Sequence, residues 1–146
     1  MTVSVIGVGA FFVVLGGDDV SKALKIIHVD MNIFTLKQMQ RDIPQIIPQA
    51  ELHSFVQPDA ALEFAKAHGC DVLMTEIELR TDRLGGYRLA KAIRELYPQV
   101  SIIFVTVWNE YEISGEMSDL KVNGLIPKPW KQEKLASSLQ ELLHQE

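Results

Sequence analysis

The chain has 146 residues, a net charge of −5 and 47% hydrophobic residues. This length suits one domain, and the ordinary composition excludes a disordered or collagen-like chain. The acidic balance, without any basic run, opposes nucleic-acid binding, and the single cysteine, Cys70, forms no internal disulfide, which fits a reducing compartment such as the cytoplasm.

The first part of the chain is an apolar segment. Residues 3–15 are almost wholly apolar, too short for a bilayer that needs about 20 residues. The first lysine comes only at position 22, which argues against a signal peptide. We expect residues 1–21 to be an extra strand or hairpin that covers either an edge of the chain's own sheet or the edge of a partner. Residues 16–19 (GGDD) resemble part of the diguanylate cyclase signature, but so close to the start of the chain they predict a turn.

From residue 22 to residue 146 we expect one domain, in which strand and helix patterns alternate. The strands are expected at 24–30, 51–56, 71–76, 100–107 and 122–126, and the helices at 32–42, 58–68, 87–97, 109–119 and 132–144. Pro44, Gly69 and Pro98 are expected to end the first three helices. Such alternation through short loops implies right-handed crossovers and a parallel sheet with helices on both faces.

Polar residues follow four of the five predicted strands. Asp30 ends the first strand and Glu76 the third, while Thr106 and Lys128 lie at the ends of the fourth and fifth. The carboxyl ends of parallel strands meet at one edge of the sheet, where functional crevices lie. The sequence therefore predicts a polar site made of these four side chains.

These strand ends resemble those of the CheY-like receiver domain of two-component response regulators. The matching pieces are IIHVD, DVLMTEIEL, GGYRLAKAIREL, IIFVT and GLIPKPW, and the resemblance extends over residues 24–144. It implies a flavodoxin-like, doubly wound, five-stranded parallel sheet of order 2-1-3-4-5. The piece IIFVTVWNEYE is similar to receivers of the LytTR-associated type.

The resemblance also implies a role for each strand end. In the family, acidic residues bind Mg²⁺, which prefers hard oxygen ligands, and an aspartate accepts a phosphoryl group. Asp30 stands at the first acidic place and Glu76 at the phosphoacceptor place, and the backbone carbonyl of Glu78 falls where the family supplies a metal ligand. Thr106 and Lys128 stand where the family contacts the phosphoryl oxygens.

Several positions depart from the family. Met31 replaces the second acid, and its thioether is a poor ligand for Mg²⁺. Glu76 is one methylene longer than aspartate, and in-line transfer loses on the order of a hundredfold in rate for about 1 Å of displacement. Leu125 replaces the aromatic switch residue, Val107 the small residue after the threonine, and Arg80 the usual proline. Metal binding by Asp30 and Glu76 alone is expected to be weak.

Two interpretations of Glu76 stay open: an ion pair with Lys128 that partly mimics the activated form, or a solvated carboxylate without a switching role. Met31 is expected to pack into a gap. His28, within the first strand, is expected to be a core or edge histidine with its hydrogen bonds satisfied. Trp108 is either core rim or a partner anchor.

The residues together favour a degenerate receiver that acts through protein–protein contacts in signalling or transcriptional regulation, without being an enzyme. The expected partners are a sensor kinase, an output domain or a second copy, bound through the face formed by the fourth helix, fifth strand and fifth helix. No nucleic acid or membrane is expected as a partner. One alternative is an orthodox, phosphorylatable receiver. The other is a small α/β enzyme, against which stands the absence of a glycine-rich phosphate loop after the first strand.

Overall fold

The structure, a computed structural model, describes residues 4–8, 11–15 and 23–143. Five parallel strands form the main sheet in the order β4-β3-β5-β6-β7. Numbered within this sheet alone, the order is 2-1-3-4-5, so the predicted flavodoxin-like, CheY-like fold is confirmed. The strands are β3 (Lys25–Val29), β4 (Glu51–Phe55), β5 (Val72–Thr75), β6 (Ser101–Thr106) and β7 (Gly124–Pro127).

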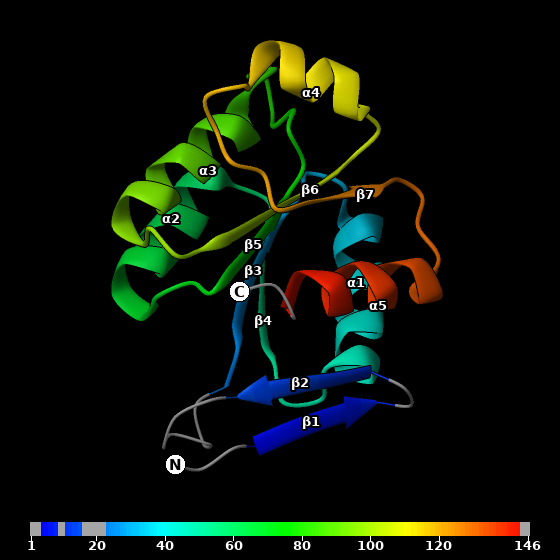
Figure 1. The fold of residues 1–146 in the computed structure, drawn as a ribbon. Helices are drawn as coiled ribbons and strands as arrows, with labels where there is room; N and C mark the ends of the chain where they lie inside the picture. The colour runs from blue at the N-terminus through cyan, green and yellow to red at the C-terminus, as the bar shows by residue number, and fades with distance from the viewer. Residues whose placement is uncertain (1–3, 9–10, 16–22, 144–146) are drawn as a thin grey trace.

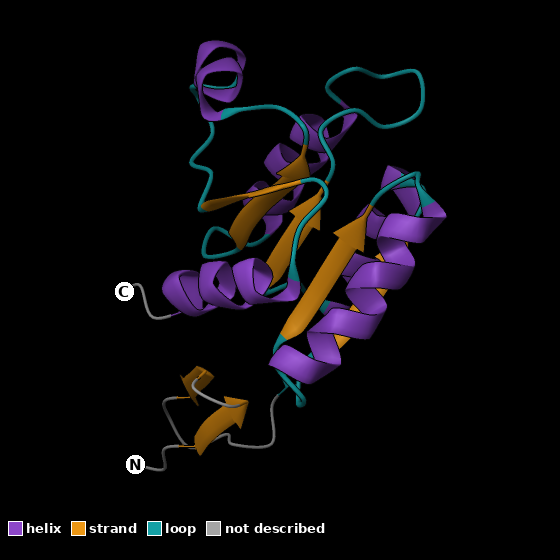
Figure 2. Cartoon of the chain, turned by 90° about the vertical axis from the view of Figure 1, so that its right-hand side faces the viewer, coloured by secondary structure: helices purple, strands orange, loops and turns teal. Residues whose placement is uncertain are grey.

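Helices cover both faces of this sheet (Figures 1 and 2). α1 and α5 lie on one face, and α2 and α3 lie on the other, with α4 beyond the carboxyl end of the sheet. None of the helices in the described part of the chain is long and apolar enough to cross a membrane. The helices are α1 (Ile33–Ile46), α2 (Pro58–His68), α3 (Gly85–Leu96), α4 (Glu110–Glu116) and α5 (Gln132–Leu143).

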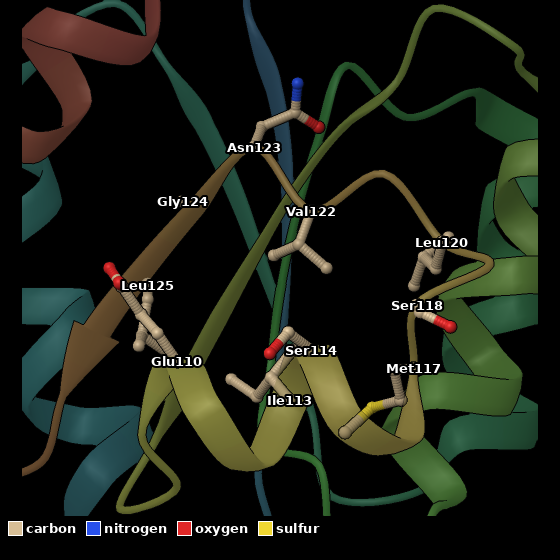
Figure 3. A pocket seen from close by; sticks show the side chains of 10 residues that line it. All are labelled: Glu110, Ile113, Ser114, Met117, Ser118, Leu120, Val122, Asn123, Gly124 and Leu125. Carbon is tan, nitrogen blue, oxygen red and sulfur yellow. The ribbon is translucent and has the colours of Figure 1, made fainter.

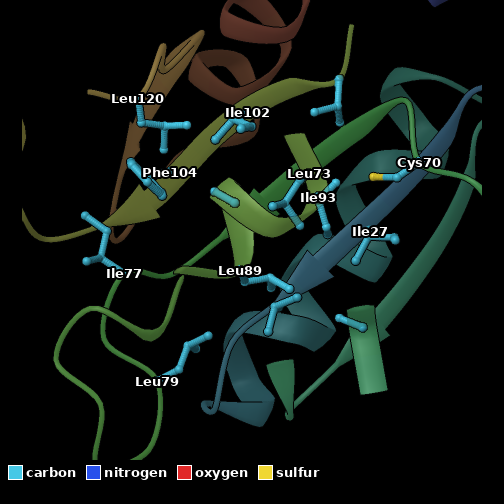
Figure 4. Close-up of a cluster of buried hydrophobic side chains, with 14 of the residues drawn as sticks. Ile27, Cys70, Leu73, Ile77, Leu79, Leu89, Ile93, Ile102, Phe104 and Leu120 are labelled. Carbon is cyan, nitrogen blue, oxygen red and sulfur yellow. The ribbon is translucent and has the colours of Figure 1, made fainter. Parts of the chain in front are cut away.

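Alternation along the strands divides the core into two layers. Within β3, Ile27 and Val29 pack toward α2 and α3, whereas Ile26 packs toward α1 and α5. Phe104 of β6, fully buried, joins the first layer, which Figure 4 shows in close-up. Both faces of the central strands are therefore apolar, as expected for parallel strands covered on both sides.

Pro44 does not end the first helix, contrary to the prediction. α1 continues through Pro44 to Ile46, although the ring removes one backbone hydrogen bond. Ile43, Ile46 and Ile47 are all buried in the second layer. Burial of these side chains, worth about 1.5–3 kcal/mol each, offsets the cost of proline in the last turn.

The apolar N-terminal segment contains two strands, β1 (Ser4–Val8) and β2 (Phe11–Leu15), paired antiparallel. They form a two-stranded sheet of their own, so among the described residues the predicted pairing with an edge of the main sheet is absent. The hairpin lies at the end of the molecule opposite to α4 (Figure 1). The GGDD sequence at 16–19 lies outside the described residues.

Candidate functional site

The predicted strand-end residues converge at the carboxyl edge of the sheet. The Lys128 ammonium lies 2.7 Å from Asp30 Oδ2 and 2.8 Å from Glu76 Oε1. These three side chains, which we call the acidic cluster, come from segments up to 98 residues apart. Asp30, Glu76 and Lys128 follow β3, β5 and β7, which are parallel strands of one sheet. Because parallel strands end at the same edge of the sheet, the three side chains can meet there.

Asp30 is the most deeply buried member of the cluster, with 4% of its side chain exposed. Its Oδ1 accepts a hydrogen bond from the backbone N–H of Asn32 at 2.8 Å, and its Oδ2 accepts one from Lys128. Asn32 in turn caps α1 by accepting from the N–H of Phe34. The sequence DMN thus ends the strand, begins the helix and orients the carboxylate in three residues.

Glu76 is held by its own chain as well as by Lys128. Its Oε2 accepts from the backbone N–H of Ile77 at 2.6 Å, and its carbonyl accepts from the Thr75 hydroxyl at 2.8 Å. Gly86 packs against this peptide so closely that a Cβ there would lie 1.8 Å from the Glu76 carbonyl oxygen. Sequence reasoning missed Gly86, although two consecutive glycines at the start of a helix were a visible signal.

Lys128 keeps its charge in spite of partial burial. Burial alone lowers the pKa of Lys128, but the hydrogen bonds to Asp30 and Glu76, with the charges of both carboxylates, outweigh it and hold the pKa above its usual value. The Glu76–Lys128 ion pair considered from the sequence is therefore present, and Lys128 pairs with Asp30 as well.

Thr106 is fully buried next to the cluster, but its hydroxyl faces another group. Thr106 Oγ1 accepts from the backbone N–H of Trp108 at 3.3 Å, and its carbonyl accepts from the N–H of Lys128 at 3.1 Å. In the described part of the chain no hydrogen bond joins this hydroxyl to Glu76 or to the Lys128 ammonium. Thr106 thus supports the backbone of β7 and the start of the next loop.

The departing residues line the mouth of the site. Met31 is 49% exposed, so the prediction that it fills a packing gap is wrong; its sulfur contacts the backbone N–H of Arg80 across the opening. Val107 is 75% exposed and points to solvent. Leu125 is half-buried on the α4 side. Glu78 is exposed, and the role of its backbone carbonyl as a metal ligand stays a prediction.

Mg²⁺ fits these residues poorly. Each of the four carboxylate oxygens of Asp30 and Glu76 already accepts a hydrogen bond, two of them from the ammonium of Lys128. The second acid of the family is the thioether of Met31, a soft ligand. Among the described residues no group of three or more His, Cys, Asp or Glu side chains could hold a metal ion.

His28 differs from its prediction. It is fully buried in β3, but within residues 4–8, 11–15 and 23–143 neither ring nitrogen has a hydrogen-bond partner, and the hydroxyl of the neighbouring Ser54 has none either. Burial lowers the pKa of His28 to about 4, so the ring is neutral at pH 7. Cys70 is also buried, and burial raises the pKa of its thiol to about 12.

Both tryptophans are largely buried. The Trp130 indole N–H donates to the carboxylate of Asp42 in α1 at 2.9 Å, so Trp130 is part of the core. Trp108 is 9% exposed, and the guanidinium of Arg83 covers its ring at 4.6 Å. A covered indole does not offer an exposed partner anchor, which favours core rim for Trp108.

Comparison with known proteins agrees with this geometry. Residues 26–140 match the response regulator receiver domain family. The chain belongs to this family. A comparison with curated proteins gave no match.

Solved receiver structures share the fold of this receiver at low sequence identity. Chemotaxis protein CheY4 of Vibrio cholerae has a TM-score of 0.73 at 21% identity, covering 83% of this chain and 99% of that one. The BeF3-activated DrrB receiver domain has a TM-score of 0.70 at 20% identity, covering 85% and 100%. The RcsB response regulator of Salmonella typhimurium has a TM-score of 0.68 at 22% identity, covering 83% and 61%.

Proposed function

We propose that this receiver of two-component signalling works by protein–protein interaction, with weak or absent phosphorylation of the chain. The observation that carries the proposal is the contact of one ammonium, Lys128, with both Asp30 and Glu76. In an orthodox receiver the lysine pairs with an incoming phosphoryl group. Here the longer Glu76 side chain reaches Lys128 directly and satisfies it without a phosphoryl group.

The site residues have corresponding roles in this proposal. Glu76 stands at the phosphoacceptor position and acts as a fixed carboxylate, while Asp30 is its partner across Lys128. Met31 marks the lost acid, and weak Mg²⁺ binding by the two carboxylates follows from their existing hydrogen bonds. Thr106 and Leu125 stand at the switch positions. In the described part of the chain, the Thr106 hydroxyl has no hydrogen bond to Glu76 or to the Lys128 ammonium.

The working unit is residues 22–146, with residues 1–21 as an additional segment. The partner is a sensor kinase, an output domain or a second copy, and the expected interface is the surface of α4, β7 and α5. A cytoplasmic location and a role in transcription regulation suit such a module. The protein is not an enzyme in this proposal; the small α/β enzyme and the orthodox receiver are its competitors.

Restoring the acids tests the proposal. Met31→Asp with Glu76→Asp returns a hard oxygen ligand and shortens the acceptor arm, beside Asp30 and Lys128 already in place. Because neither change alone rebuilds in-line geometry, the two are expected to act together. Incubation with acetyl phosphate and Mg²⁺ should add one phosphoryl group to the double variant by intact-mass analysis, and little or none to the parent.

The single variants Met31→Asp and Glu76→Asp are the controls. A phosphoryl adduct on the parent at the level of the double variant overturns the proposal in favour of an orthodox receiver. Turnover of a small substrate by the parent favours the enzyme. A double variant without adduct would mean that Val107 or the Arg80 loop also blocks the pocket.

A further inference from the structure

Arg83 lies near the end of the loop that leads from Glu76 into α3, and its side chain contacts α4. The guanidinium of Arg83 donates to both carboxylate oxygens of Glu116, at 2.7 and 2.8 Å. The same group lies over the ring of Trp108, 4.6 Å from its centroid. Arg83 therefore joins three segments: its own loop, the loop between β6 and α4 at Trp108, and the last residue of α4.

Three further residues on the same side of α3 contact the segment that follows α4. Lys91 lies 2.9 Å from the carboxylate of Asp119, which also accepts a hydrogen bond from the hydroxyl of Tyr87. Arg94 donates to the carbonyl of Lys121 at 3.0 Å. We call Arg83, Tyr87, Lys91 and Arg94 the α3 stripe.

The spacing of the stripe follows the helical repeat. Its members are three or four residues apart, so they lie along one side of α3 and its approach. Their partners Glu116, Asp119 and Lys121 follow in the same order along the chain. The stripe thus runs parallel to the segment that connects α4 with β7 and holds it at three successive points.

On the side that faces β7, α4 makes few packing contacts. Of its seven residues, all of them described, Ile113 alone is buried. A groove of about 460 Å³ separates α4 from β7, with Ile113 and Met117 on one wall and Val122 and Leu125 on the other (Figure 3). The position of α4, and with it the width of the groove, therefore depends on the α3 side.

We infer that the α3 stripe is a latch that holds α4 in one arrangement and so keeps the surface between α4 and β7 permanently formed. The latch does not depend on the protonation or phosphorylation of the acidic cluster. It goes beyond the proposed function, because it assigns the fixed shape of that surface to Arg83 and the stripe rather than to the pocket.

Hydrogen exchange of the full chain tests the latch. In Arg83→Gln and in Glu116→Gln, the backbone amides of residues 110–117 should exchange about twofold to fivefold faster than in the parent, the range expected when a short helix loses an exposed bidentate ion pair. The double variant should show no further increase, since both changes remove the same contact. Met117 donates its amide to the Ile113 carbonyl and is a suitable probe.

Arg88→Gln is the matched control. Arg88 pairs with Asp82 of the same loop, at 2.9 Å and with similar exposure, but does not touch α4. It should leave exchange in α4 unchanged. Equal exchange in Arg83→Gln and Arg88→Gln, or additive effects in the double variant, would overturn the latch. Neither result bears on the phosphorylation assay, so the two proposals fail separately.

Discussion

Asp30 of the acidic cluster and His28 lie two residues apart in the chain, but their polar groups differ in hydrogen bonding. The carboxylates of the cluster have hydrogen-bond donors, whereas the ring nitrogens of His28 have no partner among the described residues. Asp30 and Glu76 have a hydrogen-bond donor for every carboxylate oxygen, and Lys128 supplies a shared positive charge. His28 is fully buried, and among the described residues neither of its ring nitrogens has a hydrogen-bond partner.

The difference shows how a buried ionisable group keeps or loses its charge. Hydrogen bonds and opposite charges hold the pKa of Lys128 above its usual value against burial, whereas burial without partners lowers the pKa of His28 to about 4. The Lys128 ammonium is therefore charged at pH 7, whereas the ring of His28 is neutral.

The largest expected effect comes from removing the shared cation. Lys128→Met keeps the apolar stem but leaves two carboxylates facing each other, largely buried, so the free energy of unfolding should fall by about 3–5 kcal/mol at pH 7. Urea denaturation measures this. The pKa of Lys128 is higher in the folded protein than its ordinary value of 10.5. Its contribution to the free energy of unfolding is therefore complete below pH 10.5 and is lost only as the pH rises through the folded-state pKa.

The control for Lys128 is Lys131→Met, at an exposed lysine three residues later. It should change the free energy of unfolding by less than about 0.5 kcal/mol. Similar losses in the two variants would show that the ion pairs add nothing beyond an ordinary surface lysine.

His28 should make the protein sensitive to acid. Since its pKa falls from 6.5 to about 4 on folding, the unfolded chain binds more protons, and stability should drop by up to about 3 kcal/mol as the pH falls from 6.5 to 4. His28→Leu should remove this part of the pH dependence and stabilise the protein, because it removes two unpartnered nitrogens.

Thermal unfolding of parent and His28→Leu at a series of pH values isolates the histidine, since the carboxylates titrate alike in both. Parallel curves between pH 6.5 and 4 would show that His28 finds a partner on protonation.

A smaller effect is expected from Arg80, in the loop at the mouth of the acidic cluster, whose backbone conformation is strained. Arg80 has φ +56°, in the left-handed region, within a turn closed by two hydrogen bonds between Leu79 and Asp82. This conformation costs a side-chain-bearing residue about 1–2 kcal/mol, more than the entropy that glycine loses on folding. Arg80→Gly should therefore stabilise the protein by about 0.5 kcal/mol, measured by urea denaturation.

Thr81→Gly is the control for Arg80. It adds the same freedom to the unfolded chain at the next residue, where φ is not positive, and should destabilise. Destabilisation by both variants would mean that the turn is not strained.

The smallest effect is expected from the N-terminal segment. The acidic cluster and His28 both lie in the five-stranded sheet, which pairs with neither β1 nor β2. Deleting residues 1–19 should leave cooperative thermal unfolding and the effects of Lys128→Met and His28→Leu intact. Loss of cooperative unfolding would place the hairpin inside the core and move the domain boundary.

The strands, the order of the sheet and the convergence of Asp30, Glu76 and Lys128 could be predicted from the sequence. Apolar runs and punctuating residues are local signals, and parallel topology then puts all strand ends on one edge. The helix boundary at Pro44 could not, because the burial of Ile46 and Ile47 that carries the helix past it is a tertiary effect.

The sequence by itself determined the receiver fold and which residue types stand at the site, because strand periodicity and spacing are written in the chain. Only the tertiary structure decided that Lys128 joins both carboxylates, that Met31 is exposed and that the ring of His28 has no hydrogen-bond partner in the described part of the chain. Each of these depends on distances between segments far apart in sequence, and neither charge nor hydropathy of a single residue specifies which atoms meet.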